Sequence, residues 1–401
     1  MERSGQNLKV LYVEPVGGHR GMHYYDFALC SALVEQGIDP TLITCDETES
    51  HAILPFSIKR AFVGIYGSRP KWQRGISYAR GLLWVLSRVP SRDGRIVHLH
   101  FFHWPRLDEL FVRALRSRGF AVVVTVHDVV PFDAGTSHLP ALHGIYRLAD
   151  RVVVHTVASK EELTSAFGRC PDEVEVIHQG PYPGFAARAP QRSREEARAL
   201  LGLPRRDRII LFFGQIKRVK GLDTLIRSFD KVLGVYPTAR LVVAGPVWKD
   251  DHQTYADLIK GLHLTDKVVT RIEYVPDEEV PIYFQAADVV TLPYRKVYQS
   301  AVLFMAHSFA RPIVATAVGG LAEVIRDGET GWLVPPDDED ALASALCKVL
   351  ADPADAQRIG LQGKQWVEQQ YSWSRIACDL ARLYRDVLNS TDCLDSLGAR
   401  A

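Results

Sequence analysis

The stretch YRKVYQSAVLFMAHSFARPIVATAVGGLAEVIRDGETGWLV, residues Tyr294 to Val334, decides the fold. After Tyr298 it has apolar residues at spacings of three and four, which predicts a helix that ends before Pro312. The strand pattern Ile313 to Thr316 and a Gly-Gly turn follow. A loop that enters a helix N-terminus beside such a turn offers several backbone N–H groups to one anion. The alternative is an ordinary strand–helix–strand unit without a ligand.

Length and composition describe a globular protein with room for more than one core. The chain has 401 residues, of which 24% are charged and 47% hydrophobic, and its formal net charge is +1. A charge this close to zero gives no reason to expect a nucleic acid partner. The six cysteines form no CxxC pair, which favours a reducing cytoplasm over a disulfide framework or zinc ribbon. We find no signal-peptide core, and no apolar run reaches the roughly eighteen residues that span a membrane.

Strand and helix patterns alternate along the chain. Continuous runs of β-branched residues, such as Val122 to Val126, indicate strands buried on both faces and hence parallel sheets. The segment Gln179 to Pro190 has three prolines and two glycines, which is typical of a linker, and the alternation then restarts. The sequence therefore predicts an α/β protein with two doubly wound, Rossmann-like domains facing across a cleft. We expect the domains at residues 1–182 and 183–370, with a C-terminal helix at 371–401 packing back on the first.

Several motifs of the second half occur together in a family order. They are FFGQIKRVKGLDTLIRSF from Phe212, LVVAGP from Leu241, RPIVATAVGGLAEVI from Arg311 and DGETGWLVPP from Asp327. With these motifs the chain resembles the retaining GT-B glycosyltransferases of family 4. The resemblance implies transfer of a hexose from a nucleotide-diphosphate sugar to a hydroxyl of an acceptor held by the first domain. It implies no cofactor and no bound metal.

The basic loop after the strand ending at Phe213 is the expected diphosphate site. Ammonium and guanidinium groups at a helix N-terminus can stabilise a phosphate leaving group. The family usually has arginine where this chain has Gln215, so we expect Lys217 or Arg218 to replace it, while Lys220 keeps the lysine of the family. A solvated basic loop is the alternative.

The family also usually has two glutamates separated by seven residues, and this chain has Gln299 and His307 at those positions. The resemblance implies that Gln299 meets the donor sugar, since an amide can still bond hydroxyl groups, and that His307 meets the ribose. The alternative for His307 is a buried helix histidine. The phosphate site itself needs only the backbone N–H groups of Ser300, Ala301 and Val302.

The first half supplies further candidates at carboxyl ends of strands, where ligands of such sheets bind. His127 follows the strand VVVTV and is expected to touch the donor sugar, the alternative being a strand-end histidine bonded to backbone. His98, His100 and His103 suggest zinc, but no fourth ligand is evident and we do not expect a metal site. The remaining donor-binding candidates are Gly17, Gly18, Gly245 and Tyr274.

Residues 51–120 carry many more basic than acidic side chains. Trp72 and Trp84 are interleaved with basic residues that include Arg69, Arg74, Arg80, Arg88, Arg92 and Arg95. This composition suits an anionic bilayer surface at which a lipid-linked acceptor waits, and so a cytoplasmic protein peripheral on the inner face of the membrane. A solvated face with core aromatics is the alternative.

The expected role is therefore sugar transfer to a sugar, lipid-linked or small-molecule acceptor, as in polysaccharide or glycolipid synthesis. Two other classes stay open. The replaced glutamates suggest a sugar-nucleotide-binding protein that has lost catalysis, and the fold also suits an epimerase or a phosphorylase. The sequence identifies neither the base and sugar of the donor nor the acceptor.

Overall fold

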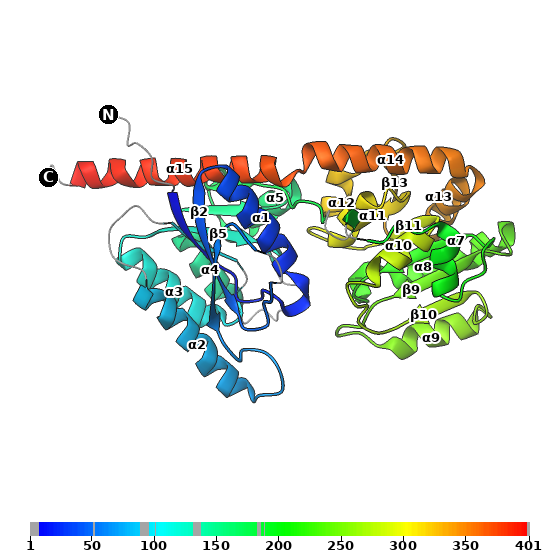
Figure 1. Cartoon of the computed structure of the whole chain (residues 1–401), viewed down its shortest axis with the longest axis horizontal. Helices are drawn as coiled ribbons and strands as arrows, with labels where there is room; N and C mark the ends of the chain where they lie inside the picture. Colours follow the sequence, from blue (N-terminus) through cyan, green and yellow to red (C-terminus); the bar gives the residue numbers. More distant parts are fainter. Residues whose placement is uncertain are drawn as a thin grey trace. The chain divides into compact units, whose positions relative to one another are not determined.

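The chain forms two compact units (Figure 1). Unit 1 contains Met1–Gly180 and Trp373–Ala401, and unit 2 contains Pro181–Ser372, against the boundaries of 182 and 370 expected from the sequence. This computed structural model describes residues 8–50, 53–88, 96–100, 102–130, 138–182, 186–187 and 189–398. Arg92, Arg95 and part of the expected linker lie outside the described residues.

The sheet of unit 1 is parallel throughout, in the order β3-β2-β1-β4-β5-β6-β7. Every residue of β5 is buried, which explains its run of β-branched side chains. The strand order reverses beside β1, so the carboxyl ends of β1 and β4 flank the switch point where such sheets bind ligands. The strands are β1 (Leu8–Val13), β2 (Ile38–Cys45), β3 (Ser57–Phe62), β4 (Ile96–Leu99), β5 (Ala121–Val126), β6 (Arg151–Val154) and β7 (Val174–Val176).

The helices of unit 1 include one from the far end of the sequence. Helix α15 packs against α1. Its Tyr384 is fully buried, and the phenol oxygen of this tyrosine lies 2.6 Å from Nδ1 of His98. The C-terminal segment thus completes the core of unit 1 (Figure 1). The helices are α1 (His23–Glu35), α2 (Lys71–Arg88), α3 (Pro105–Ser117), α4 (Leu139–Leu148), α5 (Val157–Phe167) and α15 (Trp373–Gly398), with short 3-10 turns η1 (His19–Gly21) and η3 (Pro171–Glu173).

The sheet of unit 2 is also parallel, in the order β10-β9-β8-β11-β12-β13. Its order reverses between β8 and β11, and the loops that leave these two strands carry the predicted diphosphate residues. The predicted α/β class with two doubly wound sheets is therefore confirmed. The strands are β8 (Ile209–Phe213), β9 (Arg240–Ala244), β10 (Val268–Arg271), β11 (Val289–Leu292), β12 (Ile313–Thr316) and β13 (Trp332–Val334).

Buried residues from the helices of unit 2 join those of the strands in one hydrophobic core. Across the described residues, we find no helix whose length and hydropathy would let it span a lipid bilayer. The helices are α7 (Arg194–Leu200), α8 (Leu222–Val235), α9 (His252–Gly261), α10 (Val280–Ala286), α11 (Ala301–Ser308), α12 (Gly319–Val324), α13 (Glu339–Ala351) and α14 (Pro353–Gln370), with the turn η4 (Arg218–Lys220).

Candidate functional site

The loop after β8 packs tightly on the loop after β11 at the switch point of unit 2. A Cβ placed on Gly221 would lie only 2.0 Å from the carbonyl oxygen of Pro293, and Gly221 has a φ of 63°, so a larger residue is excluded on both counts. A Cβ placed on Gly214 would lie 3.0 Å from Cγ2 of Val302 and 3.7 Å from Nζ of Lys220. Lys220 and the start of α11, predicted separately from the sequence, therefore lie together.

Lys220 is held by the aromatic residue that follows β11. Its Nζ donates to Oη of Tyr294 at 3.3 Å and lies 4.8 Å from the centroid of that ring. Tyr294 is 1% exposed, so it offers a rigid wall, whereas Lys220 is half-buried and keeps access to solvent. A cation held over an aromatic ring is oriented by the charge distribution of the ring.

The N-terminus of α11 is capped from within. Oγ of Ser300 accepts from the backbone N–H of Leu303 at 3.3 Å, and Gln299 is half-buried just before the cap. A Cβ on Gly319 would lie 1.8 Å from the carbonyl oxygen of Val297, so the Gly-Gly turn packs against this loop. The helix thus begins at a fixed point beside Gly214, where its first N–H groups can meet an anion.

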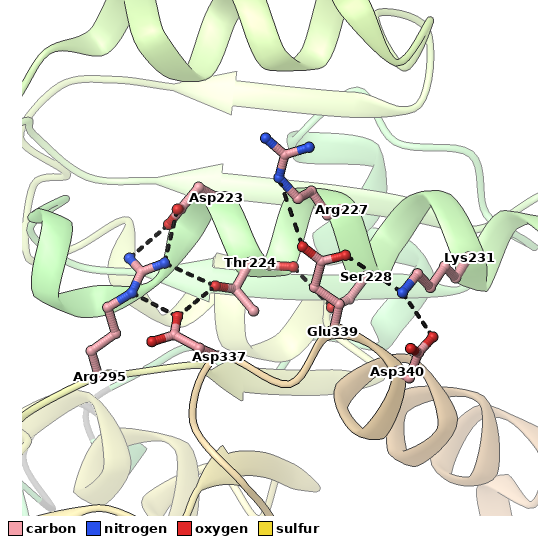
Figure 2. Close-up of polar contacts among 9 residues, drawn as sticks. All are labelled: Asp223, Thr224, Arg227, Ser228, Lys231, Arg295, Asp337, Glu339 and Asp340. Atoms are coloured by element: carbon pink, nitrogen blue, oxygen red, sulfur yellow. Dashed lines mark hydrogen bonds and ion pairs between the residues drawn. The ribbon is translucent and has the colours of Figure 1, made fainter.

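An ion-pair network fixes the basic loop from its other side (Figure 2). Nη1 and Nη2 of Arg295 donate to the two carboxylate oxygens of Asp223 at 2.8 Å each, and Nε donates to Asp337 at 2.7 Å. Nη1 also donates to the carbonyl oxygen of Arg218 at 2.8 Å. Burial opposes ionisation of Asp223, but its bonds with Arg295 lower the pKa of Asp223 overall. Arg295 therefore holds the start of α8 by its two-pronged contact and η4 by its bond to Arg218, and so keeps Lys220 at the end of β11.

Sequence reasoning missed Arg295 and Tyr294 as parts of this arrangement. The only signal was their position directly after a buried strand ending at Pro293, because Asp223 and Asp337 lie 72 and 42 residues away along the chain. Pairings at such separations leave no local pattern.

The other predicted residues of unit 2 lie around the same strand ends. Lys217 is half-buried and Arg218 is exposed on η4. Gly245 follows β9, and a Cβ there would lie 2.1 Å from the carbonyl oxygen of Gly214. Tyr274 follows β10, is exposed, and donates to Oδ1 of Asp277 at 3.0 Å. Gly245 is thus in direct contact with the Lys220 loop.

His307 requires a correction. It lies near the C-terminal end of α11, is fully buried, and packs against α14, where a Cβ on Gly363 would lie 2.4 Å from its Nδ1. Burial lowers the pKa of His307 to about 3, so its ring is neutral. A ribose cannot reach this ring without displacing α14, so the prediction that His307 binds the donor is wrong and its alternative, a buried helix histidine, holds.

In unit 1 the glycine loop after β1 is bound to its own strand. Backbone N–H groups of Val16 and Gly17 donate to the carboxylate of Glu14, the first at 2.8 Å, and Gly18 N–H donates to Oγ1 of Thr48 at 2.8 Å. Glu14 is fully buried beside Asp26 of α1. Burial raises the pKa of Glu14 to about 7, and burial with the Glu14 charge raises that of Asp26 well above its usual range.

A row of buried histidines follows the strand ends of unit 1. Nδ1 of His155 lies 2.7 Å from the carbonyl oxygen of Ile177, Nε2 of His155 lies 3.2 Å from Nδ1 of His127, and Nε2 of His127 lies 2.9 Å from Nδ1 of His100. Burial lowers the pKa of all three well below the ordinary value, so the rings are neutral. Because a carbonyl only accepts, His155 carries its proton on Nδ1, and the same tautomer follows for His127 and then His100.

This row changes what His127 can do. Both of its ring nitrogens bond other histidines, so a sugar hydroxyl would need the ring to leave His100 or His155. The histidines of the suggested zinc triplet also bond other groups: His98 bonds Tyr384 and Thr125, and His103 bonds Tyr66. Within the described part of the chain, no group of three or more His, Cys, Asp or Glu side chains is arranged to hold a metal ion.

Comparison with known proteins assigns both halves of the chain. The family described as "Glycosyltransferase Family 4" matches residues 20–181, and "Glycosyl transferases group 1" matches residues 193–366. Together the two matches leave only the ends and a short segment between them unassigned.

Individual relatives of the chain are also named as glycosyltransferases. The chain is 28% identical to a D-inositol 3-phosphate glycosyltransferase of Kineococcus radiotolerans over 92% of this chain and 91% of that protein. It is 32% identical to one of Corynebacterium aurimucosum over 60% of this chain, an alignment that spans 58% of that protein's length. A solved structure, Anabaena Alr3699/HepE in complex with UDP-glucose, shares the fold with a TM-score of 0.73 at 17% identity, covering 94% of this chain and 100% of the other.

Proposed function

Because the chain belongs to the group 1 glycosyltransferases of family 4, we propose that it moves a hexose from a nucleotide-diphosphate sugar to an acceptor hydroxyl with retention of configuration. The observation that carries this proposal is the position of Lys220 beside Gly214 and the N-terminus of α11. Such a site suits a diphosphate better than any neutral ligand, because a cation and the N-terminus of a helix converge there.

The residues of this site act on the phosphate that leaves the sugar. As the bond between the anomeric carbon and the phosphate oxygen breaks, negative charge grows on that phosphate, and Lys220 with the N–H groups of Ala301 and Val302 stabilises it. Lys217 or Arg218 adds charge from η4, and Gln299 bonds the sugar hydroxyls. Gly245 and Tyr274 contact the nucleotide. The proposed roles of Gly17, Gly18 and His127 in unit 1 remain predictions.

Retention follows from attack on the same face that the phosphate leaves. The acceptor oxygen forms its bond to the anomeric carbon, and its proton passes to the departing phosphate oxygen, so no enzyme nucleophile is needed. We expect neither a cofactor nor a metal, because Lys220 and the helix N-terminus meet the charge of the diphosphate.

Two acceptor classes have support. The relatives named for D-inositol 3-phosphate make a phosphorylated polyol one candidate. The exposed face of α2, with Trp72, Ile76 and Leu83 among basic residues and no acidic residue in the helix, makes a lipid-linked acceptor the other, as in glycolipid or polysaccharide synthesis. The second would put the protein on the cytoplasmic face of a membrane.

A binding protein without turnover is the rival function, and the observation that favours it is Gln299 in place of a carboxylate. One experiment separates the two. The purified chain is incubated with radiolabelled UDP-, GDP- and ADP-sugars, including UDP-glucose, and with either inositol 3-phosphate or a cell lipid extract. Sugar transfer from one donor, with an α-linkage from an α-donor, supports the proposal. Donor binding without transfer to any acceptor contradicts it and leaves the binding protein.

A further inference from the structure

A large cavity lies in unit 2 at the end of α11 away from Lys220. Its volume is about 630 Å³, and it lies between the start of α7, α10, the segment before β12, and α14. We call it the linker pocket. The side chains that matter to its chemistry are Arg192, Arg194, Gln285, Arg311, Lys364 and Glu368. Because Ser300 caps the opposite end of the same helix, this pocket is distinct from the diphosphate site.

Two residues that line the linker pocket each have a buried polar atom without a partner within the described structure. Gln285 is 9% exposed, and its Nε2 donates to the carbonyl oxygen of Pro190 at 3.0 Å, which fixes the orientation of the amide. Its Oε1 is therefore an acceptor with no donor, and Nη1 of Arg192 is a buried donor with no acceptor. Buried polar groups are almost always hydrogen-bonded, so both atoms point to a molecule that supplies a donor and an acceptor.

Charge at the linker pocket is unbalanced toward positive. Arg194 is paired with Asp288 at 3.1 Å, and Lys364 with Glu368 at 3.8 Å. Among the described residues, the hydrogen bonds of Arg311 go only to carbonyl oxygens, those of Phe309 and Ala287. The carboxylate of Asp288 also acts on Arg311, but it is already paired with Arg194 and Arg198.

Arg311 thus remains as a surplus cation, and Arg192 is a second guanidinium at the pocket, whose charge also acts on Glu196. Burial, followed by the nearby charge of Arg194, lowers the pKa of Arg311 to about 10, which still leaves it charged at neutral pH. An oxyanion would relieve this repulsion and match the planar guanidinium groups.

We propose that the linker pocket binds a small oxyanion that also carries hydroxyl groups, a phosphorylated sugar being the fitting class. The oxyanion contacts Arg192 and Arg311, and a hydroxyl donates to Oε1 of Gln285. The volume lies within the range of about 300 to 1,000 Å³ typical of small-molecule sites. A ligand here bridges α11, α14 and the segment before α7, so it stiffens the helix whose other end lies beside Lys220.

The test distinguishes the contribution of the anionic group to binding from that of the hydroxyl groups. It also distinguishes binding at the linker pocket from binding at the donor site. Calorimetric titrations use glucose 6-phosphate, its neutral parent glucose, inorganic phosphate, and glucuronate, which carries a carboxylate instead. All are measured with K220A, which weakens phosphate binding at the donor site. We expect one molecule of glucose 6-phosphate per chain, weaker binding of phosphate and of glucuronate, and no binding of glucose.

The variants R192Q and Q285M should each weaken glucose 6-phosphate binding at least about tenfold, while R227Q, an exposed arginine paired with Glu339 on α8, should leave it unchanged. Thermal unfolding of each variant without ligand checks that it folds. No binding of any probe would overturn the proposal. The proposal would also be overturned if R192Q and Q285M bound glucose 6-phosphate as tightly as the chain without these two changes. Sugar transfer from the donor is measured separately in the wild type, so this failure is distinct from failure of the proposed function.

Discussion

Lys220 owes its position to three consecutive residues on the other side of the switch point. Pro293 packs on Gly221, Tyr294 faces the ammonium group, and Arg295 binds the carbonyl oxygen of Arg218. The lysine side chain is long and flexible, so these contacts remove much of the freedom that it would otherwise lose on binding the proposed diphosphate.

Replacing Lys220 by alanine should lower the turnover number about a hundredfold, on the order of 3 kcal/mol of transition-state stabilisation. The measurement is steady-state kinetics with the donor identified by the sugar-nucleotide panel. Lys231→Ala is the matched control, because Lys231 lies on α8 and pairs with Asp340 at 2.7 Å on an exposed surface (Figure 2). Turnover by K220A equal to that of the control would remove Lys220 from the site.

Replacing Gln299 and replacing His307 by alanine should have different effects. Gln299→Ala should lower turnover with little change in thermal stability, because the side chain is half-buried at the loop before α11. His307→Ala should leave the donor Michaelis constant unchanged and lower the free energy of unfolding by roughly 1 to 3 kcal/mol through the cavity that it leaves. A raised Michaelis constant in H307A would restore His307 to the donor site.

The sequence could place Lys220 and Gln299 at strand ends of unit 2 because both follow predicted strands, and ligands of parallel sheets gather at those ends. It could not tell which way His307 points. Val302, Leu303, Phe304 and Ala306 are buried too, so α11 has no clear polar face from which a side chain's direction could be inferred. The tautomers of the histidine row depend on a carbonyl of Ile177, which no pattern of side chains reveals.

At the scale of elements, α2 is unusual in what it leaves uncovered. Trp72, Ile76 and Leu83 are 65%, 51% and 63% exposed, and their spacings of four and seven residues put them on one face. Tyr78, Leu82 and Val85 on the opposite side are buried in unit 1. The helix is therefore anchored by one apolar side while it presents another among basic residues.

Reversing charge on this helix should weaken membrane binding. The variant R80E/R88E changes two exposed arginines, and each basic residue near an anionic surface is worth about 1 kcal/mol, so we expect vesicle affinity to fall by more than tenfold. Co-sedimentation with phosphatidylserine vesicles at low and high salt measures it, and wild-type binding should fade as salt shortens the Debye length.

R205E/R206E, on an exposed loop of unit 2, changes net charge equally and serves as the control. Equal losses in both variants, or no wild-type binding at low salt, would leave α2 as ordinary solvated surface and favour a water-soluble acceptor.

At the scale of the whole molecule, the described groups that burial keeps neutral are concentrated in unit 1. Folding there requires uncharged histidines, since burial lowers the pKa of His98 to about 3 and of His155 to about 4, and this contribution is lost as pH falls below about 6.5. It also requires a protonated Asp26, whose raised pKa means that stability is lost as pH rises above the unfolded value of about 3.9.

Asp26→Asn should therefore stabilise the protein more at pH 8 than at pH 5. The asparagine carries no charge in either state, so its advantage should grow by about 1.4 kcal/mol per pH unit wherever folded Asp26 keeps its proton. Chemical denaturation at several pH values measures the difference, and Asp39→Asn, at an exposed position of β2, is the control. An advantage of D26N that does not change with pH would mean that Asp26 is ionised in the folded chain.

The two-sheet architecture was predictable, because fully buried parallel strands have a distinctive run of β-branched residues. The strand orders, with their switch points beside β1 and β8, came only from the structure. Which residues of α15 enter the core of unit 1 was equally hidden, since Tyr384 and His98 are 286 residues apart.

A chain that ends at Ser372 should lose unit 1 and keep unit 2. It lacks the buried Ile376, Leu380, Tyr384 and Val387 of α15, which fill the core beside α1. Limited proteolysis followed by mass spectrometry should show a resistant fragment from about Pro181 to Ser372 and rapid digestion of the preceding residues, while the full chain protects both. Equal resistance of residues 8–180 in the truncated chain would show that α15 is dispensable.

Because unit 1 is made of the two ends of the sequence, the order of synthesis differs from the order of completion. A ribosome translates most of unit 1 first, yet that part stays without its last helix until α15 has left the exit tunnel. Unit 2 is continuous and can close as soon as Ser372 emerges. The strands and helices of unit 1 that are translated first therefore keep apolar surface exposed until after unit 2 can close, which is the interval in which such surface is prone to aggregation.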